Sequence, residues 1–543
     1  MFTTFVKRLT PLQWVTWISI FMATLATAYS FYYGYTISYG DAESHLNIAK
    51  RVIESLTPGF AQLGGIWLPL PHILLIPFVY FDVLWRTGLA GAIISGIAFV
   101  ISAIYIYKLA FLLTKHSGAS FVASLVFIIN PNVLYLQSTP MTELTLIVFF
   151  VLSSYYFISF LLDDSNLLML ILAAFFGFCA SLSRYDGWGL VLMEAGILVL
   201  HYLPYKIRVD WSNVSRKIQN VFIPSTDRTF GERWGLLEGR LIMFATMAFF
   251  GIALWILWGF LILGDPLYFT HSEFSANSQQ LSWFARGELP AYKHLDVAFL
   301  YYFVTSVESS GFVLSLAAMI GMILFFLSKR TQYRSYIFLI LMVPFIFNIL
   351  TLYLGQSVIF IPGITPTTFE WTLFNVRYGV MMLPLIALFI GYLFYRAKFA
   401  MRVMIIGIIA LQSALFYIGF TPVLSLDDSV SGLSSAIAKM PDAQQWLEDN
   451  YDHGKLLTDD FARTISIIRT PVHMKDVIYI GNKPYWEESL IEPEKYARWI
   501  VMQQNDTLWK NIYEDRQTNA RLFKYFNKVY TSEDILIFRR IDN

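Results

Sequence analysis

Twelve apolar stretches, most of them about 20 residues long, constrain the fold of this chain more than any other feature. A helix needs roughly 20 apolar residues to cross a bilayer. Hydrophobic residues make up 56% of the chain and charged residues only 14%, so lipid is its main solvent. The sequence therefore predicts an all-α polytopic membrane domain over residues 1–423, with stretches at 14–33, 68–85, 88–109, 119–138, 142–162, 167–183, 187–203, 241–263, 298–327, 335–355, 376–395 and 400–421.

Lysine and arginine in the short loops predict the orientation, because these residues collect on the cytoplasmic side. If every stretch crossed the membrane, the N-terminal Lys7 and Arg8 and the basic segment from Lys206 to Arg240 would lie on opposite sides. Stretch 68–85 contains three prolines, and lipid cannot replace the hydrogen bonds that proline removes. We expect a re-entrant or interfacial element there, which leaves about eleven spans, a cytoplasmic N-terminus and an extracytoplasmic C-terminus.

The chain from 424 to 543 is more polar and predicts a small, extracytoplasmic soluble α/β domain. It contains no glycine-rich nucleotide loop, no Cys/His set with metal-ligand spacing and no nucleophile elbow. The formal charge of +1 argues against a nucleic-acid partner. Short apolar runs predict buried strands at 455–458, 477–480, 499–502 and 535–538, with helices at 441–450 and 506–514.

Two carboxylates, Asp41 and Glu43, follow directly on the first apolar stretch, in the predicted first outer loop, 34–87. Residues 41–56 have helical apolar spacing, with Asp41 near the start, where the helix dipole favours an anion. An amphipathic interfacial helix with an N-cap aspartate would give the same pattern. Ionisable groups at a membrane face are costly, however, and they usually handle a substrate, an ion or a proton.

Further ionisable residues are predicted on the same face of the membrane. Glu143 begins a span, Arg184 and Asp186 lie between two spans, and Arg377 precedes Tyr378 at a span entrance. Charges gathered at one face favour an enzyme over the rival class, a transporter or flippase of a lipid-linked or small anionic substrate. Transporters commonly contain inverted repeats with broken helices at the midplane, and no such symmetry is visible here.

Several short motifs give this chain a resemblance to a known family. They are the Asp41-Ala-Glu43 loop, Gly65-Ile-Trp-Leu-Pro-Leu-Pro-His72, Thr139-Pro-Met-Thr-Glu143 and Asn375-Val-Arg377-Tyr378-Gly. In this order they resemble the GT-C glycosyltransferases. The chain is most similar to the branch of the protein O-mannosyltransferases and the lipid A aminoarabinose transferase. The W-W-D-Y-G signature of the oligosaccharyltransferase branch is absent from its C-terminal part.

The resemblance implies a glycosyltransferase that moves a sugar from a polyprenyl-phosphate carrier to a glycan, lipid or protein acceptor at the extracytoplasmic face, with inversion. Such a reaction needs a base on the acceptor hydroxyl and positive charge on the departing phosphate. In the family the first-loop aspartate is the base, a role that falls here to Asp41. Glu43 is either the base itself or the group that orients it.

The remaining candidates are assigned to substrate or metal. Arg377, beside Tyr378, is expected to bind phosphate, because guanidinium holds phosphate oxygens in a bidentate way. The alternative is an interfacial anchor, a common use of arginine beside aromatic residues. Arg184 either shares that task or forms a structural salt bridge with Asp186. Glu143 is assigned to a substrate, to a metal ion or to a plain polar helix end. His72 is a substrate-binding candidate, or else a satisfied structural histidine in its apolar stretch. A divalent metal ion stays open, with possible ligands Asp41, Glu43, His45 and His72.

Overall fold

The computed structural model describes residues 9–202, 230–272, 275–328, 333–433, 441–459 and 465–541, so most of the basic segment 206–240 lies outside it. Contacts between Cα atoms divide the chain into two compact units. The first, here called the helical unit, comprises Met1–Ser30, Gly65–Pro71 and Ile93–Asp428. The second, the α/β unit, comprises Phe31–Gly64, His72–Ala92 and Ser429–Asn543, and so joins most of the first loop to the C-terminal segment.

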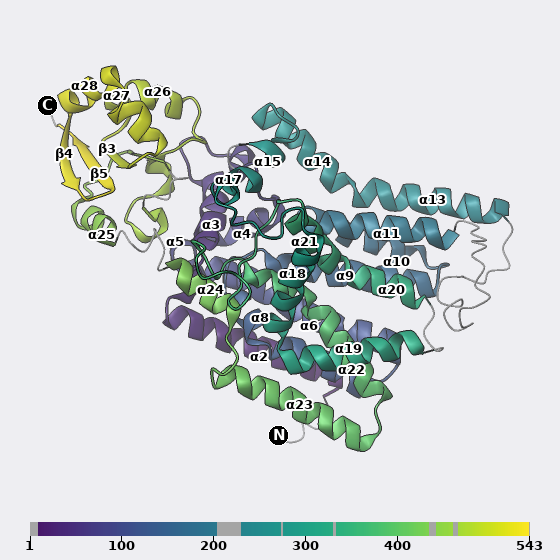
Figure 1. Cartoon of the computed structure of the whole chain (residues 1–543). Coiled ribbons are helices and arrows are strands. Elements are labelled where there is room, and N and C mark those ends of the chain that lie inside the picture. The colour runs from purple at the N-terminus through teal and green to yellow at the C-terminus, as the bar shows by residue number, and fades with distance from the viewer. Residues whose placement is uncertain are drawn as a thin grey trace. The chain divides into compact units, whose positions relative to one another are not determined.

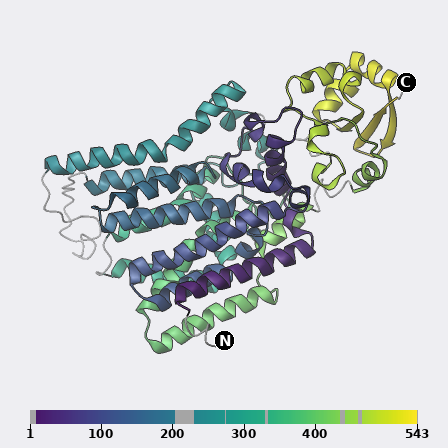
Figure 2. The same cartoon turned by 180° about the vertical axis from the view of Figure 1, so that it is seen from behind.

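The helical unit is a bundle of apolar helices, in which α9, α10, α11 and α13 run side by side (Figures 1 and 2). The main helices are α2 (Pro11–Tyr32), α6 (Leu89–Thr114), α7 (Ser117–Ile128), α8 (Pro131–Leu136), α9 (Glu143–Leu162), α10 (Leu167–Ser181), α11 (Asp186–Tyr202), α13 (Phe230–Ala248), α14 (Phe250–Trp258), α18 (Leu295–Ser310), α19 (Phe312–Leu327), α20 (Arg334–Leu341), α21 (Val343–Tyr353), α22 (Leu383–Arg396) and α23 (Phe399–Tyr417). Shorter elements are η3 (Gly259–Leu263), α15 (Tyr268–His271), α16 (Ala276–Gln279), α17 (Leu281–Ala285), η4 (Val376–Met382) and α24 (Leu424–Leu433).

The helices confirm the all-α membrane domain. In the part of the chain that the structure describes, six helices are long and apolar enough to cross a bilayer, and two bent pairs raise this number to eight. Helix α4 (Leu70–Val79), in the proline-containing stretch, has only 10 residues, about half the length that a span needs. By length and composition this is a multi-pass membrane chain, whereas its orientation and the figure of about eleven crossings stay predictions.

One apolar stretch that looks continuous in sequence is sharply bent in the structure. Residues 298–327 form α18 and α19, whose axes meet at 108°. Gly311 lies at the bend with φ +94°, and a Cβ at this position would meet the side chain of Gln412 at 2.4 Å. Only glycine fits both the backbone conformation and the close approach.

The α/β unit contains a five-stranded sheet of order β2-β1-β3-β5-β4. Strand β1 is parallel to β2 and β3, while β5 is antiparallel to β3 and β4. The elements after residue 440 are α25 (Pro441–Asn450), β1 (Leu456–Thr458), η5 (Ile467–Arg469), η6 (Met474–Asp476), β2 (Val477–Ile478), α26 (Tyr485–Ile491), α27 (Pro493–Tyr496), β3 (Trp499–Gln503), η7 (Trp509–Tyr513), α28 (Arg516–Tyr525), β4 (Phe526–Thr531) and β5 (Ile535–Arg540).

Alternating side chains of β3 pack on both faces of the sheet. Ile500 and Met502 join a buried core with side chains of α26 and α28, whereas Trp499 meets Trp446 of α25 at a ring distance of 6.2 Å (Figure 1). The predicted strands and the helix 441–450 are confirmed. In place of the predicted helix 506–514 the structure has the π-helical turn η7. Strand β4 was not predicted, because it is a mostly exposed edge strand whose residues do not alternate between apolar and polar.

The first loop contributes η1 (Tyr35–Ile37), α3 (Gly40–Ile53), η2 (Phe60–Leu63), α4 and α5 (Asp82–Arg86). Arg86 donates hydrogen bonds to the backbone carbonyls of Ile468, Thr470 and Val472. One guanidinium therefore satisfies three carbonyls of an irregular segment, which fixes this segment against α5.

Asp506, in the turn after β3, gives the α/β unit a pH dependence. Its carboxylate accepts the backbone N–H groups of Gln503 and Trp509, at 2.7 and 2.6 Å, yet burial raises the pKa of Asp506 to about 6. Because the pKa of Asp506 is higher in the folded protein than in the unfolded chain, where it is near 3.8, the protonated group stabilises the folded state. This stabilisation is complete below about pH 3.8 and is lost as the pH rises through about 6. We expect up to about 3 kcal/mol from this group.

The change Asp506→Asn should remove this dependence, because asparagine does not ionise. Hydrogen exchange of β3 and η7 amides in the purified protein, followed between pH 4.5 and 7.5, measures it. Protection in the wild type should fall more steeply with pH than protection in the variant. Equal slopes would show that Asp506 does not carry the effect.

Candidate functional site

Asp41, the predicted base, is the second residue of α3 and is half-buried. The helix begins after Tyr39, whose backbone is extended, and the positive end of its dipole stabilises a carboxylate at this point. Ten of the 14 residues of α3 are buried, so it is more enclosed than the amphipathic interfacial helix predicted from sequence.

Glu43 lies one position beyond Ala42 on the same helix and is 8% exposed. Its Oε1 accepts a hydrogen bond from Nε of Arg469 at 2.7 Å, and its Oε2 accepts one from the hydroxyl of Ser466. Arg469 also donates to the carbonyl of Ile37, at 2.9 Å. Both carboxylate oxygens of Glu43 therefore fix the start of α3 to the segment before η6. The sequence could not predict this contact, because the two residues are more than 400 positions apart.

We expect Arg469→Ala to loosen the start of α3 by about 1 kcal/mol, because the pair is partly exposed and solvent screens it. Hydrogen exchange of residues 37–46 should increase. The matched control is Arg521→Ala, which removes an arginine of α28 that pairs with Glu492 and Glu494. This change should leave the exchange of the amides at 37–46 unaltered. Equal protection in both variants would show that the Glu43–Arg469 pair does not hold the helix.

His45 and His72 are bound to each other, with Nδ1 of His45 and Nε2 of His72 at 2.9 Å. His72 is completely buried. A ring nitrogen engaged in this bond cannot also ligate a metal ion. The predicted metal site at Asp41, Glu43, His45 and His72 stays a prediction. Within the described ranges, one group of His, Cys, Asp and Glu side chains brings three ligand atoms within 4.8 Å of one another: Glu54, Asp82 and His473.

In the helical unit, Glu143 is the first residue of α9 and is fully buried. Its Oε1 accepts from Nη1 of Arg184 at 3.0 Å and from Nε of Arg377 at 3.3 Å. Its Oε2 is buried and has no hydrogen-bond partner among the residues described. One carboxylate thus lies between two arginines that are far apart in sequence.

Two further carboxylates approach the same arginines. Nε of Arg184 lies 3.5 Å from Oδ2 of Asp186, and Nη1 of Arg377 lies 3.7 Å from Oδ2 of Asp428. Although burial alone would lower the pKa of Arg184, the neighbouring carboxylates raise it above its ordinary value, so this guanidinium stays charged.

The ring of Tyr378 lies beside both guanidinium groups, with its centroid 4.9 Å from Cζ of Arg184 and 5.1 Å from Cζ of Arg377. The start of η4 is set by Asn375, which adopts a left-handed conformation with φ 56° and donates from its side chain to the carbonyl of Val358 at 3.0 Å. Tyr302 donates to the carbonyl of Tyr378 at 3.1 Å. These bonds present Arg377 and Tyr378 to the cluster.

The structure therefore gathers all five predicted substrate-binding residues of the helical unit, together with Asp428, into one arginine cluster, made of Glu143, Arg184, Asp186, Arg377, Tyr378 and Asp428. His72 belongs to the α/β unit. Sequence reasoning missed Asp428, which lies in a helix, α24, after the last predicted span. Three carboxylates therefore oppose two guanidinium groups in this cluster.

Comparison with solved structures shows that the chain has the fold of the GT-C polytopic glycosyltransferases. It is similar to ArnT from Cupriavidus metallidurans bound to undecaprenyl phosphate, with a TM-score of 0.57, 10% identity, and 96% of this chain and 98% of that chain covered. For the same ArnT in the apo state the values are 0.52, 12%, 95% and 97%. The likeness confirms the predicted resemblance at the level of the fold.

Archaeal oligosaccharyltransferase AglB from Archaeoglobus fulgidus, in complex with an inhibitory peptide and a dolichol-phosphate, matches less well. Its TM-score is 0.42 at 11% identity, over 90% of this chain and 69% of that chain. No protein-family model matches the sequence, and no curated protein does.

Proposed function

We propose that this protein is a membrane glycosyltransferase that moves a sugar from a polyprenyl-phosphate carrier to an acceptor hydroxyl. The observation that carries the proposal is the convergence of Arg184 and Arg377 on Glu143, over 41 and 234 residues of sequence. Paired guanidinium groups recognise phosphate oxygens well. The fold supports the same function, since a similar structure, that of ArnT, binds undecaprenyl phosphate.

In this proposal Asp41 is the general base. Its carboxylate accepts the proton of the acceptor hydroxyl, and the hydroxyl oxygen attacks the anomeric carbon from the face opposite the phosphate. The bond from this carbon to the phosphate oxygen breaks, its electron pair leaves with the polyprenyl phosphate, and the anomeric configuration is inverted. Arg377 and Arg184 stabilise the negative charge that develops on the leaving phosphate.

Glu43 and His72 then act as positioning residues. Glu43 holds the start of α3 through Arg469 and Ser466. His72 bonds to His45, which stands four residues after Asp41 and so shares a face of the helix with it. Neither group needs to touch the reacting atoms.

We also propose that donor binding changes a partner in the arginine cluster. The cluster holds an excess of one negative charge, and a phosphate group adds more. Among the ion-pair distances described for these residues, that of Arg377 and Asp428, 3.7 Å, is the longest. We propose that Asp428 yields its place on Arg377 to the phosphate, while Glu143 and Asp186 keep the arginines aligned.

The test is consumption of donor by the purified protein in detergent, with a panel of polyprenyl-phosphate sugars and acceptors. We expect one donor to be consumed, with free polyprenyl phosphate as product. Detergent removes the second compartment, so conversion of the donor distinguishes a transferase from a transporter. Movement of an unconverted lipid across reconstituted vesicles, with no donor consumed, would favour a transporter or flippase instead.

A further inference from the structure

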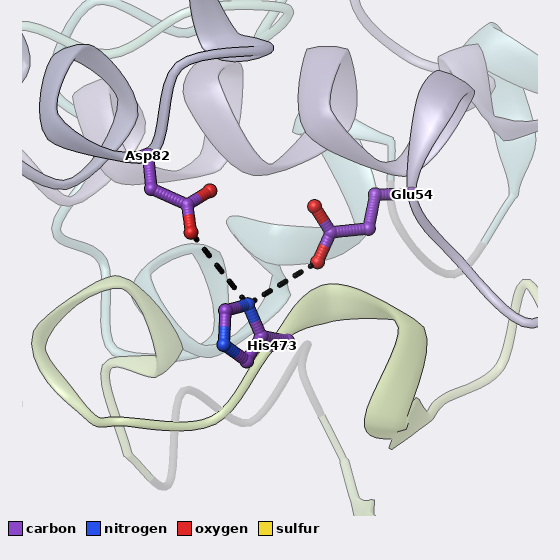
Figure 3. A group of neighbouring side chains, drawn as sticks. All are labelled: Glu54, Asp82 and His473. Atoms are coloured by element: carbon purple, nitrogen blue, oxygen red, sulfur yellow. Dashed lines mark ion pairs between the residues drawn. The ribbon is translucent and has the colours of Figure 1, made fainter.

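A group of three metal-ligating side chains lies in the α/β unit, apart from the residues assigned above (Figure 3). Glu54 caps the end of α3, Asp82 begins α5, and His473 precedes η6. Three separate segments of the chain therefore meet at this point. Glu54 is 23% exposed, and Asp82 and His473 are 42% and 43% exposed, so water and ions reach the group.

A buried lysine holds the two carboxylates in place. Nζ of Lys50 lies 2.8 Å from Oε2 of Glu54 and 2.6 Å from Oδ1 of Asp82, and the lysine side chain is only 2% exposed. This leaves Oε1 of Glu54 and Oδ2 of Asp82 facing Nδ1 of His473. Oε1 of Glu54 is shielded from solvent and has no hydrogen-bond partner among the described side chains.

The two distances from His473 to the carboxylates match ligands around an ion better than they match direct bonds, and all three ligand atoms lie within 4.8 Å of one another. Nδ1 of His473 lies 3.6 Å from Oε1 of Glu54 and 3.7 Å from Oδ2 of Asp82, both beyond a hydrogen bond. Two ligands of a tetrahedral zinc ion, each about 2.1 Å from the metal, are separated by about 3.4 Å. Small shifts of exposed side chains would bring all three atoms to that spacing.

We propose that Glu54, Asp82 and His473 bind a divalent cation of the zinc class, with water completing the coordination. One imidazole and two carboxylates suit zinc, which accepts nitrogen and oxygen ligands. Nζ of Lys50 donates to Oδ1 of Asp82 at 2.6 Å, a contact that favours the charged carboxylate needed in a metal ligand. Lys50 and the nearby Arg86 offset part of the negative charge, which makes the binding weaker than at a site without them.

The ion would fasten the first loop to the C-terminal segment. It binds the end of α3 and the start of α5 to the residue before η6. Asp41 lies at the opposite end of α3, so the ion positions this helix and takes no part in the transfer of the sugar. The inference therefore stands whether or not the proposed function is correct.

The experiment is binding of Zn²⁺ and Co²⁺ to the chelator-treated, full-length protein in detergent. We expect one equivalent of Zn²⁺ by calorimetry and a visible absorption band of tetrahedral Co²⁺. Zn²⁺ should also raise the unfolding temperature and slow hydrogen exchange at the end of α3. His473→Ala and Glu54→Gln should lose these effects. His271→Ala, which removes a histidine paired with a single carboxylate, Asp265, should retain them.

Absence of Zn²⁺ binding to the wild type would overturn the proposal. So would binding that survives in both His473→Ala and Glu54→Gln. If His473→Ala fails to fold, Glu54→Gln decides, because it keeps the shape of the side chain. A third result would also overturn the proposal. If acid stabilises the contact of His473 with Glu54 and Asp82 while Zn²⁺ has no effect, a protonated His473 bridges the two carboxylates directly.

Discussion

Replacing Asp41 with asparagine is expected to lower the rate of sugar transfer by about 10²- to 10⁴-fold, the usual contribution of a general base. Asparagine has nearly the same shape as aspartate, so α3 should keep its fold and its buried contacts. The loss should appear in kcat, since the base acts on the acceptor hydroxyl in the transition state, while affinity for the donor changes little. Steady-state kinetics with the identified donor measure both quantities.

Asp442 provides the matched control, because it too is an aspartate in the first turn of a helix, α25. Asp442→Asn should transfer sugar at the wild-type rate. The measured unfolding temperature of each variant separates a lost base from a lost fold. Unchanged kcat in Asp41→Asn would remove Asp41 from the mechanism, and Glu43→Gln would then be the variant to assay.

Arg377→Ala should have the second large effect, because it alters both donor binding and stability. Loss of a charge-assisted contact with phosphate costs about 1.5–3 kcal/mol, which corresponds to about a 10- to 100-fold weaker donor affinity. The same change leaves Glu143 buried with one arginine fewer, and breaking a buried ion pair costs about 3–5 kcal/mol. Binding of a polyprenyl phosphate and denaturant unfolding measure the two losses separately.

A double variant distinguishes a phosphate site from a purely structural ion cluster. In Arg377→Ala with Glu143→Gln, the buried carboxylate no longer carries a charge, so much of the lost stability should return. Donor affinity should stay low, because no guanidinium replaces that of Arg377. If stability and donor affinity recover together, the cluster is structural. Arg377→Lys should keep part of the affinity, since an ammonium attracts phosphate without bidentate geometry.

The candidate site was predictable to different degrees. Glu143, Arg184 and Arg377 could be named from sequence because ionisable residues at the ends of apolar stretches are rare and costly. Their mutual contacts could not, since nothing in the sequence says which span ends adjoin. Arg469 and Asp428 were missed for a related reason: each lies in a polar segment where a charged residue is ordinary. His473 gave no signal either, because its two carboxylate neighbours lie about 400 residues away in sequence.

The sequence by itself determined the local features of this protein: its apolar helices, four of the five strands of the C-terminal sheet and the helix after Gly40. These depend on hydrophobicity and its period over 5 to 20 neighbouring residues, which any stretch of chain carries within itself. Only the tertiary structure decided that α18 and α19 part at Gly311, that the first loop joins the C-terminal segment in one unit, and that two arginines share Glu143. Those outcomes depend on packing and on the burial of charged side chains between segments that are distant in sequence. Such a contact forms only when the complete fold brings the segments together and removes their charged groups from water.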